Sequence, residues 1–379
     1  MIIVKRAIES QIEEGIGKNK VLLLLGTRRV GKTFLIKSIQ KKLAQPAVNL
    51  NGEDFEVQAL LKNITAANYN LIVGSAKLLI IDEAQAVPDI GKILKFMIDT
   101  IPALTVLATG SSSFDLLNKA GEPLTGRKIQ FNLYPLSQLE FTGIETYADS
   151  VQHLEERLVL GSYPELLQLE SYKEKSEYLL ELIQSYLLKD ILAFEGIRQS
   201  DKIIRLLRLI AYQIGSEVSY NELASQLGMS KNTVETYLDL LSKVFIIYKL
   251  PAYSTNHRKE ISKGSKWYFF DNGIRNAIIN DFKLLSLRND IGALWENYLI
   301  SERIKRNRYL KENVEYYFWR TYSQQEVDLI EIRDGKIHAF EFKYSPDKKV
   351  KIPPAFSTAY PEASFERIAK DNYFNWITQ

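Results

Sequence analysis

The sequence predicts an α/β fold, with a parallel sheet flanked by helices, from three short apolar runs and the segments between them. The runs cover residues 21–25, 78–81 and 104–108. Short, mostly apolar runs are typical of strands that are buried on both faces, as in parallel sheets. A helical pattern follows the first run, with these side chains on one side: Phe34, Leu35, Ile39 and Leu43.

A glycine-bounded loop joins the first predicted strand to this helix, and its sequence, GTRRVGKT at 26–33, fits G-x-x-x-x-G-K-[ST]. Gly26 and Gly31 let the backbone turn and approach a ligand closely. Main-chain N–H groups of such a loop and of a helix N-terminus can point at the phosphate oxygens of a nucleotide. Lys32 would reach the β- and γ-phosphates, and Thr33 would hold Mg²⁺. The motif and its flanking elements therefore predict an ATP site.

The second apolar run ends in Asp82-Glu83, which is a Walker B pattern. Asp82 would lie beside Mg²⁺ and Glu83 would polarise the attacking water, because phosphoryl transfer needs one carboxylate for the metal and another for the nucleophile. The third run ends in a polar cluster, where Thr109 or Ser111 could sense the γ-phosphate or cap the next helix. The predicted nucleotide-binding residues are Gly26, Thr27, Arg28, Arg29, Val30, Gly31, Lys32, Thr33, Phe34, Asp82 and Ser111.

Gly126 and Arg127 precede a fourth predicted strand at residues 129–133. Arg127 could act as an arginine finger, in cis or from a neighbouring subunit, and would then be catalytic together with Lys32 and Glu83. The alternative for Arg127 is a structural ion pair. The sequence leaves both interpretations open.

Five stretches of the chain resemble, in this order, the motifs of a prokaryotic family of AAA-type P-loop ATPases that carry a C-terminal domain of unknown function. They are GTRRVGKT, LLIIDEAQ, LATGSSS, the Gly126-Arg127 pair and NLYPLSQLEF. The resemblance covers nearly the whole chain, and its first two motifs are highly specific. It implies a nucleoside-triphosphatase built on a core of parallel strands.

Composition limits the other classes of function. The chain has 379 residues, which suggests two or three domains, and it has no cysteine, which excludes disulfides and thiolate metal sites. Its three histidines are far apart in sequence, so a zinc site is not expected. No apolar run is long enough to span a bilayer, and the net charge is only +3. We expect a cytoplasmic, soluble protein without membrane contacts, in which nucleic-acid binding would need local basic patches.

The predicted domain organisation has four segments. A P-loop ATPase domain covers residues 1–145, a helical connector 146–200, a winged-helix domain 201–275 and a nuclease-like α/β domain 276–379. Three charged residues of the connector could contact the nucleotide, although solvated charge is the simpler interpretation: Lys189, Asp190 and Arg198.

The segment 201–270 resembles a winged helix. A glycine turn at 228–230 separates two predicted helices, and two predicted strands flank a loop at 253–265. The functional interpretation is DNA binding, with helix 231–241 in the major groove and the wing on phosphate. The alternative is a winged helix used for protein contacts or for packing against the ATPase core. The residues expected to face DNA are Lys231, Asn232, Thr233 and Thr236 on the helix and His257, Arg258, Lys259 and Lys263 in the wing.

An Asp-Gly dipeptide at 334–335 joins two runs of alternating residues near the C-terminus, and it predicts a type I′ hairpin. The turn fixes the register, which places Asp328 opposite Glu341 and Glu326 opposite Lys343. Two carboxylates that face each other repel. A divalent cation would relieve that repulsion.

Asp328, followed on the next strand by Glu341-x-Lys343, resembles the core of the PD-(D/E)XK nuclease pattern. The resemblance implies that the two acids hold Mg²⁺ and that Lys343 activates water or stabilises developing charge. Glu296, on an upstream predicted helix, fits that pattern's helical acid. The alternatives are a decayed fold, or a solvated hairpin with a Glu326–Lys343 pair. The candidate residues of this second metal site are Glu296, Asp328, Glu341 and Lys343.

The sequence therefore supports an ATP-binding and ATP-hydrolysing molecular switch, which uses ATP and Mg²⁺ and couples its nucleotide state to the winged-helix and nuclease-like module. A second hypothesis is an ATP-gated, metal-dependent enzyme that binds or cleaves DNA. A third is a signalling or scaffold ATPase that binds only a partner protein. An oligomer is compatible with all three.

Overall fold

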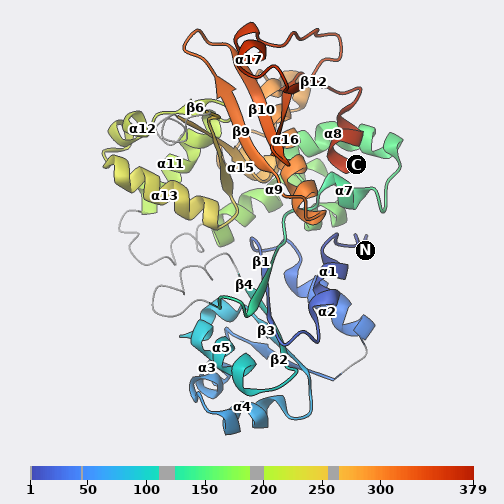
Figure 1. The fold of residues 1–379 in the computed structure, drawn as a ribbon, viewed down its shortest axis with the longest axis vertical. Helices are drawn as coiled ribbons and strands as arrows, with labels where there is room; N and C mark the ends of the chain where they lie inside the picture. The colour runs from blue at the N-terminus through green and yellow to red at the C-terminus, as the bar shows by residue number, and fades with distance from the viewer. Residues whose placement is uncertain (1, 44–45, 111–123, 188–199, 255–263) are drawn as a thin grey trace. The chain divides into compact units, whose positions relative to one another are not determined.

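The computed structural model describes residues 2–43, 46–110, 124–187, 200–254 and 264–379 (Figure 1). The chain divides into two compact units. The N-terminal unit comprises Lys5–Tyr134 and Lys243–Phe245, and the C-terminal unit comprises Met1–Val4, Pro135–Ser242 and Ile246–Gln379.

A five-stranded sheet forms the centre of the N-terminal unit, in the order β2-β3-β4-β1-β5. Each pair of neighbouring strands is parallel, which confirms the predicted parallel sheet. The strand that the sequence did not reveal is β2, at the edge, where exposed Asn49 and Asn51 interrupt the apolar pattern. The strands are β1 (Val21–Leu25), β2 (Ala47–Asn51), β3 (Leu78–Asp82), β4 (Thr105–Gly110) and β5 (Lys128–Asn132).

Helices cover both faces of this sheet: α1 and α2 lie on one side in Figure 1, and α3, α4 and α5 lie on the other. Because successive side chains of a strand point to opposite faces, Leu23 and Leu25 share one core with Tyr69 of α4 and Met97 of α5. The spacing of Ile8, Ile12 and Ile16 predicts a helix at 3–16, and the helix in the structure is shorter, with seven residues. The helices are α1 (Glu9–Gly15), α2 (Lys32–Leu43), α3 (Phe55–Lys62), α4 (Ala66–Val73), the 3-10 turn η1 (Ala84–Ala86) and α5 (Ile90–Thr100).

Helices and a small antiparallel sheet, in the order β6-β8-β7, form the first part of the C-terminal unit. Ser219 caps α12 by accepting the Glu222 N–H (3.4 Å). The elements are α7 (Gln138–Phe141), α8 (Tyr147–Leu160), η3 (Pro164–Gln168), α9 (Tyr172–Leu182), η4 (Ile183–Leu187), α11 (Ser200–Tyr212), β6 (Glu217–Val218), α12 (Tyr220–Leu227), α13 (Lys231–Lys243), β7 (Ile247–Pro251) and β8 (Ser265–Phe269).

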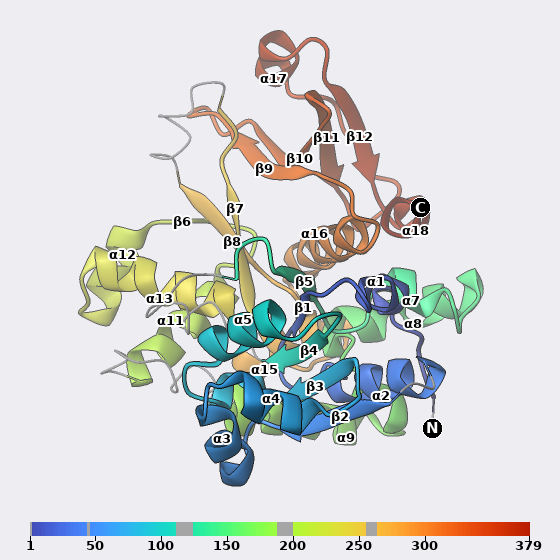
Figure 2. The same cartoon turned by 60° about the horizontal axis from the view of Figure 1, so that its bottom comes forward.

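A four-stranded mixed sheet, in the order β12-β11-β10-β9, forms the other part of this unit, and Figure 2 shows α16 beside it. The β10–β11 hairpin has the predicted turn, since Arg333 pairs with Lys336 and both turn residues, Asp334 (φ 49°) and Gly335 (φ 75°), have positive φ. The elements are α15 (Asn272–Ile278), η5 (Leu285–Leu287), α16 (Ile291–Tyr309), β9 (Glu315–Arg320), β10 (Glu326–Arg333), β11 (Lys336–Phe342), α17 (Pro354–Ala359), β12 (Ser364–Ile368) and α18 (Tyr373–Thr378).

The two sheets of the C-terminal unit are connected by a main-chain hydrogen bond. Tyr253, which follows β7, donates its N–H to the main-chain oxygen of Phe318 in β9 (2.6 Å). The segments predicted as connector, winged helix and nuclease-like domain therefore lie in one compact unit. The boundaries predicted between them stay predictions.

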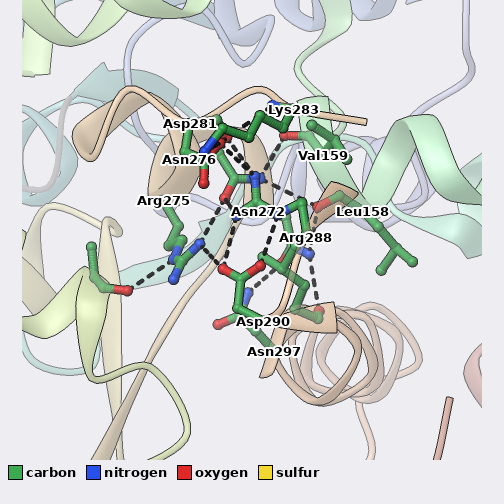
Figure 3. A network of polar contacts seen from close by, with 12 residues as sticks. Leu158, Val159, Asn272, Arg275, Asn276, Asp281, Lys283, Arg288, Asp290 and Asn297 are labelled. Carbon is green, nitrogen blue, oxygen red and sulfur yellow. Dashed lines mark hydrogen bonds and ion pairs between the residues drawn. The ribbon is translucent and has the colours of Figure 1, made fainter. Parts of the chain in front are cut away.

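A buried polar network joins α8, α11, α15 and α16 within this unit (Figure 3). Asn272 donates to the main-chain oxygens of Leu158 in α8 and of Leu294 in α16 (both 3.0 Å). Arg275 donates through Nε to the main-chain oxygen of Ala211 (2.8 Å) and through Nη1 to Asp290 Oδ2 (2.6 Å). Because these paired polar groups come from segments far apart in sequence, they hold the helices together as one body.

Replacing Arg275 with methionine should lower the free energy of unfolding of the C-terminal unit by about 3 kcal/mol, because the buried Ala211 carbonyl and the partly buried Asp290 carboxylate lose a charged donor. Equilibrium denaturation measures the change. Lys283→Met is a matched control, since the Lys283 side chain is 67% exposed and its Nζ forms only a long ion pair, 3.9 Å from Asp281 Oδ1. Its expected cost is below about 0.5 kcal/mol. Equal losses in the two variants would contradict the role of the network.

Candidate nucleotide-binding site

The predicted phosphate loop follows β1 at the carboxyl end of the parallel sheet, and its two glycines meet definite steric demands. A Cβ atom on Gly26 would lie 2.2 Å from the main-chain oxygen of Leu133, so a larger residue would displace the backbone. Gly31 has a φ of +95°, in the region that favours glycine. The loop turns sharply there, and α2 begins at the next residue, Lys32.

Lys32 is buried, and its ammonium group lies inside the loop. Nζ donates to the main-chain oxygens of Gly26 (2.9 Å) and Thr27 (3.1 Å). A lysine side chain is a flexible stem with three donors, so it can exchange such carbonyl partners for phosphate oxygens. The positive charge of the Lys32 ammonium therefore lies inside the loop, where a phosphate bound to the loop would contact it.

Thr33 and Asp82 bring the two predicted nucleotide motifs together. Thr33 Oγ1 donates to Asp82 Oδ2 (2.8 Å), although 49 residues separate them in sequence. A hydroxyl and a carboxylate oxygen are hard ligands of the kind that Mg²⁺ takes beside water and phosphate oxygens. The donor atoms of these two residues therefore fit Mg²⁺.

Thr109, at the carboxyl end of β4, connects to both acids of the Walker B pattern. Its hydroxyl donates to Asp82 Oδ1 and accepts the main-chain N–H of Glu83 (2.9 Å). The residue is fully buried, so this hydroxyl is committed to positioning the two acids. Of the two candidates at this strand end, Thr109 is described, and Ser111 lies outside the described residues.

Glu83 follows β3 in a left-handed conformation, with a φ of 49°. Such a conformation is uncommon for a residue with a side chain, and it turns the chain into η1. Gln85, two residues on, donates its amide to Glu83 Oε2 (2.5 Å). The bond holds one of the two carboxylate oxygens of Glu83 in place.

A cleft of about 460 Å³ opens beside Thr33 and Asp82. Apolar side chains from α2 and the sheet form part of its wall, and the rest is polar. The two residues that fit Mg²⁺ therefore line an open cleft. Its polar side chains from α2 and β2 are Lys37, Gln40, Asn49 and Asn51.

The residues of the second predicted metal site come close together in the C-terminal unit. Burial, followed by the nearby charges of Glu296 and Glu341, raises the pKa of Asp328 well above its usual range. Lys343 donates to Glu341 Oε1 (2.7 Å). The alternative Glu326–Lys343 pair is wrong, because Lys343 pairs with its own strand neighbour.

Sequence reasoning missed Lys266, which lies in β8 and reaches the same cluster. Its side chain forms ion pairs with both Glu296 and Glu326. Among the residues that the structure describes, no three His, Asp or Glu side chains are placed to hold one metal ion together. Glu296, Asp328 and Glu341 are therefore close, but they do not form a group of three metal ligands.

Three family models match successive parts of the chain, and the first covers the phosphate loop and the Walker B strand. Residues 18–142 match a model described as an AAA domain. This segment has the fold of an AAA-type P-loop ATPase. Residues 151–285 and 291–373 match two domains of unknown function, DUF8612 and DUF4143.

Relatives resemble the chain over most of its length. The uncharacterized protein Rv2008c of Mycobacterium tuberculosis is 29% identical over 349 residues, which cover 90% of this chain and 74% of the relative. The uncharacterized protein MJ1544 of Methanocaldococcus jannaschii is 25% identical over 404 residues, which cover 97% of this chain and 88% of the relative. Among solved structures, the Thermotoga maritima RuvB Holliday junction branch migration motor is 18% identical. The match covers 69% of this chain and 95% of the RuvB chain, with a TM-score of 0.33.

Arg6 supports the phosphate loop of the AAA-type fold, although it lies outside every motif that the sequence analysis identified. The adjacent basic residues Lys5 and Arg6 predict surface charge in the sequence. That prediction is wrong for Arg6, since only 5% of it is exposed. Its guanidinium donates to the main-chain oxygens of Val30 in the loop and Tyr134 after β5 (both 2.6 Å). No local pattern could have revealed partners so far along the chain.

Replacing Arg6 with alanine should weaken nucleotide binding about tenfold or more, and lower the free energy of unfolding of the N-terminal unit by about 2 kcal/mol. Two buried carbonyls lose a charged donor, and the loop loses its tie to the sheet. Calorimetric titration and thermal unfolding measure the two effects. Lys5→Ala is the neighbouring control, because Lys5 is exposed. Equal behaviour of the two variants would refute the role of Arg6.

Arg127 lies at the other end of the sheet of the AAA domain. Its main-chain oxygen accepts the N–H of Val21, the first residue of β1, and its side chain pairs with Asp99 (2.5 Å). The five residues of β1 separate it from the loop, a rise of roughly 16 Å, which is too far for an arginine side chain to cross. An arginine finger in cis therefore does not fit, and the predicted ion pair is present, with Asp99. A finger that Arg127 supplies to a neighbouring subunit stays a prediction.

Other predicted contact residues vary in their exposure. Arg28, in the loop, has a long ion pair with Glu53 (3.8 Å), and Phe34 is 45% exposed at the start of α2. On α13, Lys231 and Asn232 are exposed.

No helix in the described part of the chain is both long and apolar enough to cross a membrane. Predicted residues outside the described ones are Lys189, Asp190, Arg198, His257, Arg258, Lys259 and Lys263.

Proposed function

We propose that the AAA domain binds ATP with Mg²⁺ and hydrolyses it. The observation that carries this proposal is the connection of Thr33, Asp82 and Thr109 by hydroxyl–carboxylate hydrogen bonds. It joins the phosphate loop to the Walker B strand and leaves Glu83 beside them, which is the arrangement that phosphoryl transfer to water requires.

The residues of the nucleotide-binding site have three roles: they bind the phosphates, hold Mg²⁺ and orient the attacking water. Main-chain N–H groups of residues 26–33 and the Lys32 ammonium bind the phosphates, and Thr33 and Asp82 would hold Mg²⁺. Mg²⁺, when bound, neutralises charge that develops on the phosphates. Glu83 orients a water molecule and accepts its proton.

Calorimetry with the full-length protein tests the proposal directly. MgATP titrated into folded protein should release heat of binding, and the same sample should release inorganic phosphate on incubation. Titration in the presence of a chelator should weaken the binding, since Thr33 and Asp82 would lose the ion that links them to the phosphates. Folded protein that gives no binding heat with MgATP would reject the proposal.

We further propose that the nucleotide state repositions the C-terminal unit as one body. The Arg275 network supports this, because it ties four helices of that unit together. Three residues in the middle of the C-terminal unit's sequence, Lys243–Phe245, also belong to the N-terminal unit. Small-angle scattering with and without a slowly hydrolysed ATP analogue should differ, while hydrogen exchange around α15 should not change.

DNA binding is a second candidate function, through the winged helix that we assign to α11, α12, α13 and strands β6 to β8. Its support is the exposed N-terminal end of α13, with Lys231 and Asn232. Glu235, on the same helix, pairs with Lys231 (3.6 Å), and its negative charge partly offsets the positive charge offered to a phosphate. Fluorescence anisotropy with duplex DNA at two salt concentrations tests it, since phosphate contacts give steep salt dependence. Absence of salt-sensitive binding would favour a protein partner instead.

A further inference from the structure

One lysine lies among the carboxylates that the sequence had suggested as a metal site. The Lys266 side chain is 2% exposed, and its Nζ is 3.3 Å from Glu296 Oε1. It also pairs with Glu326, so one ammonium group joins β8 to α16 and to β10. Tyr268, two residues on, donates its hydroxyl to the same Glu296 oxygen.

Two carboxylates contact the Lys266 ammonium group directly. Glu296 and Glu326 both pair with it, and Asp328 lies nearby, so the negative charge that these acids carry offsets the cost of burying a cation. The Phe318 ring, 5.4 Å from Nζ, adds a favourable aromatic contact. The ammonium is therefore the cation that the Glu296 and Glu326 carboxylates share.

A divalent ion would compete with this ammonium for the same oxygens. Glu326 and Glu296 already accept hydrogen bonds from Lys266, and Asp328 Oδ2 accepts the main-chain N–H of Phe342 (2.8 Å). Two cations at such close range inside a protein repel strongly. The cluster therefore cannot accommodate the lysine and a metal ion together without losing contacts that are already made.

We propose that Lys266 takes the place of a divalent metal ion among Glu296, Glu326 and Asp328. The cluster then binds no metal and has no metal-dependent nuclease activity. It serves as an ionic tie between the small sheet and the C-terminal sheet. This proposal does not depend on the ATP site, because it concerns residues of the C-terminal unit alone.

Mn²⁺ titrated into nucleotide-free, full-length protein tests the proposal, with melting temperature (Tm) and electron paramagnetic resonance as readouts. Lys266→Met should lower the Tm by roughly 10 °C, because it leaves carboxylates buried without their cation. Mn²⁺ should then recover roughly 5 °C at about 100 times its Kd, since the Glu296 and Glu326 oxygens lose the ammonium that competes with a metal ion for them. Adding Asp328→Asn should remove that recovery.

A comparison of the wild-type protein with Asp328→Asn tests the proposal even if the Lys266→Met variant does not fold. Its Mn²⁺ response should be the same as that of Asp328→Asn, and any loss of bound Mn²⁺ in Asp328→Asn would overturn the proposal. Lys343→Met is the matched control, because Lys343 pairs with Glu341 and is partly exposed. A gain of Mn²⁺ binding in Lys343→Met as large as in Lys266→Met would also overturn the assignment.

Discussion

Replacing Lys32 with alanine should weaken ATP binding on the order of a hundredfold. Charged hydrogen bonds from the ammonium to two phosphates are worth about 3 kcal/mol together, and each 1.4 kcal/mol is about tenfold in Kd. The remaining loop N–H groups and Mg²⁺ would still bind the phosphates weakly. Calorimetric titration of MgATP measures the loss, and phosphate release should fall with it.

The control for Lys32→Ala must separate lost binding from lost folding. Lys32 is buried and donates to Gly26 and Thr27 of its own loop, so its removal costs some stability as well. Thermal unfolding of the variant should still be cooperative. Lys41→Ala removes an exposed lysine from the same helix and should bind ATP normally. Normal turnover by Lys32→Ala would contradict the assigned site.

The phosphate loop and the hairpin could be predicted because their signals are local. Residues 21–33 contain the strand, the glycine loop and the start of the helix in one stretch, and the Asp334-Gly335 turn sets the register of its own two strands. In both cases the residues that determine the conformation are neighbours in sequence. Alternation, glycine positions and motif spacing are sufficient information there.

The contacts that the sequence did not reveal join residues that are far apart along the chain. Arg6 meets Val30 and Tyr134, and Lys266 meets Glu296 and Glu326, in each case through a buried cation. Side-chain burial at these positions depends on how separate elements pack, which no local pattern encodes. A lone basic residue in a sequence reads as surface charge for the same reason.

Replacing Glu83 with glutamine should leave ATP binding almost unchanged and slow hydrolysis on the order of a hundredfold to a thousandfold. The amide keeps the size of the carboxylate and can still accept the hydrogen bond from Gln85, but it cannot take a proton from water. The variant should therefore accumulate bound ATP. Single-turnover phosphate release measures the chemical step, and calorimetry measures the binding.

The glutamine variant also distinguishes catalysis from positioning. Glu83 lies in a left-handed conformation and its N–H is held by Thr109, so the substitution leaves the backbone contacts intact. A loss of affinity as large as the loss of rate would mean that Glu83 shapes the loop and does not act on water. Glu56→Gln changes an exposed acid of α3 and should alter neither quantity. Unchanged hydrolysis by Glu83→Gln would remove Glu83 from the mechanism.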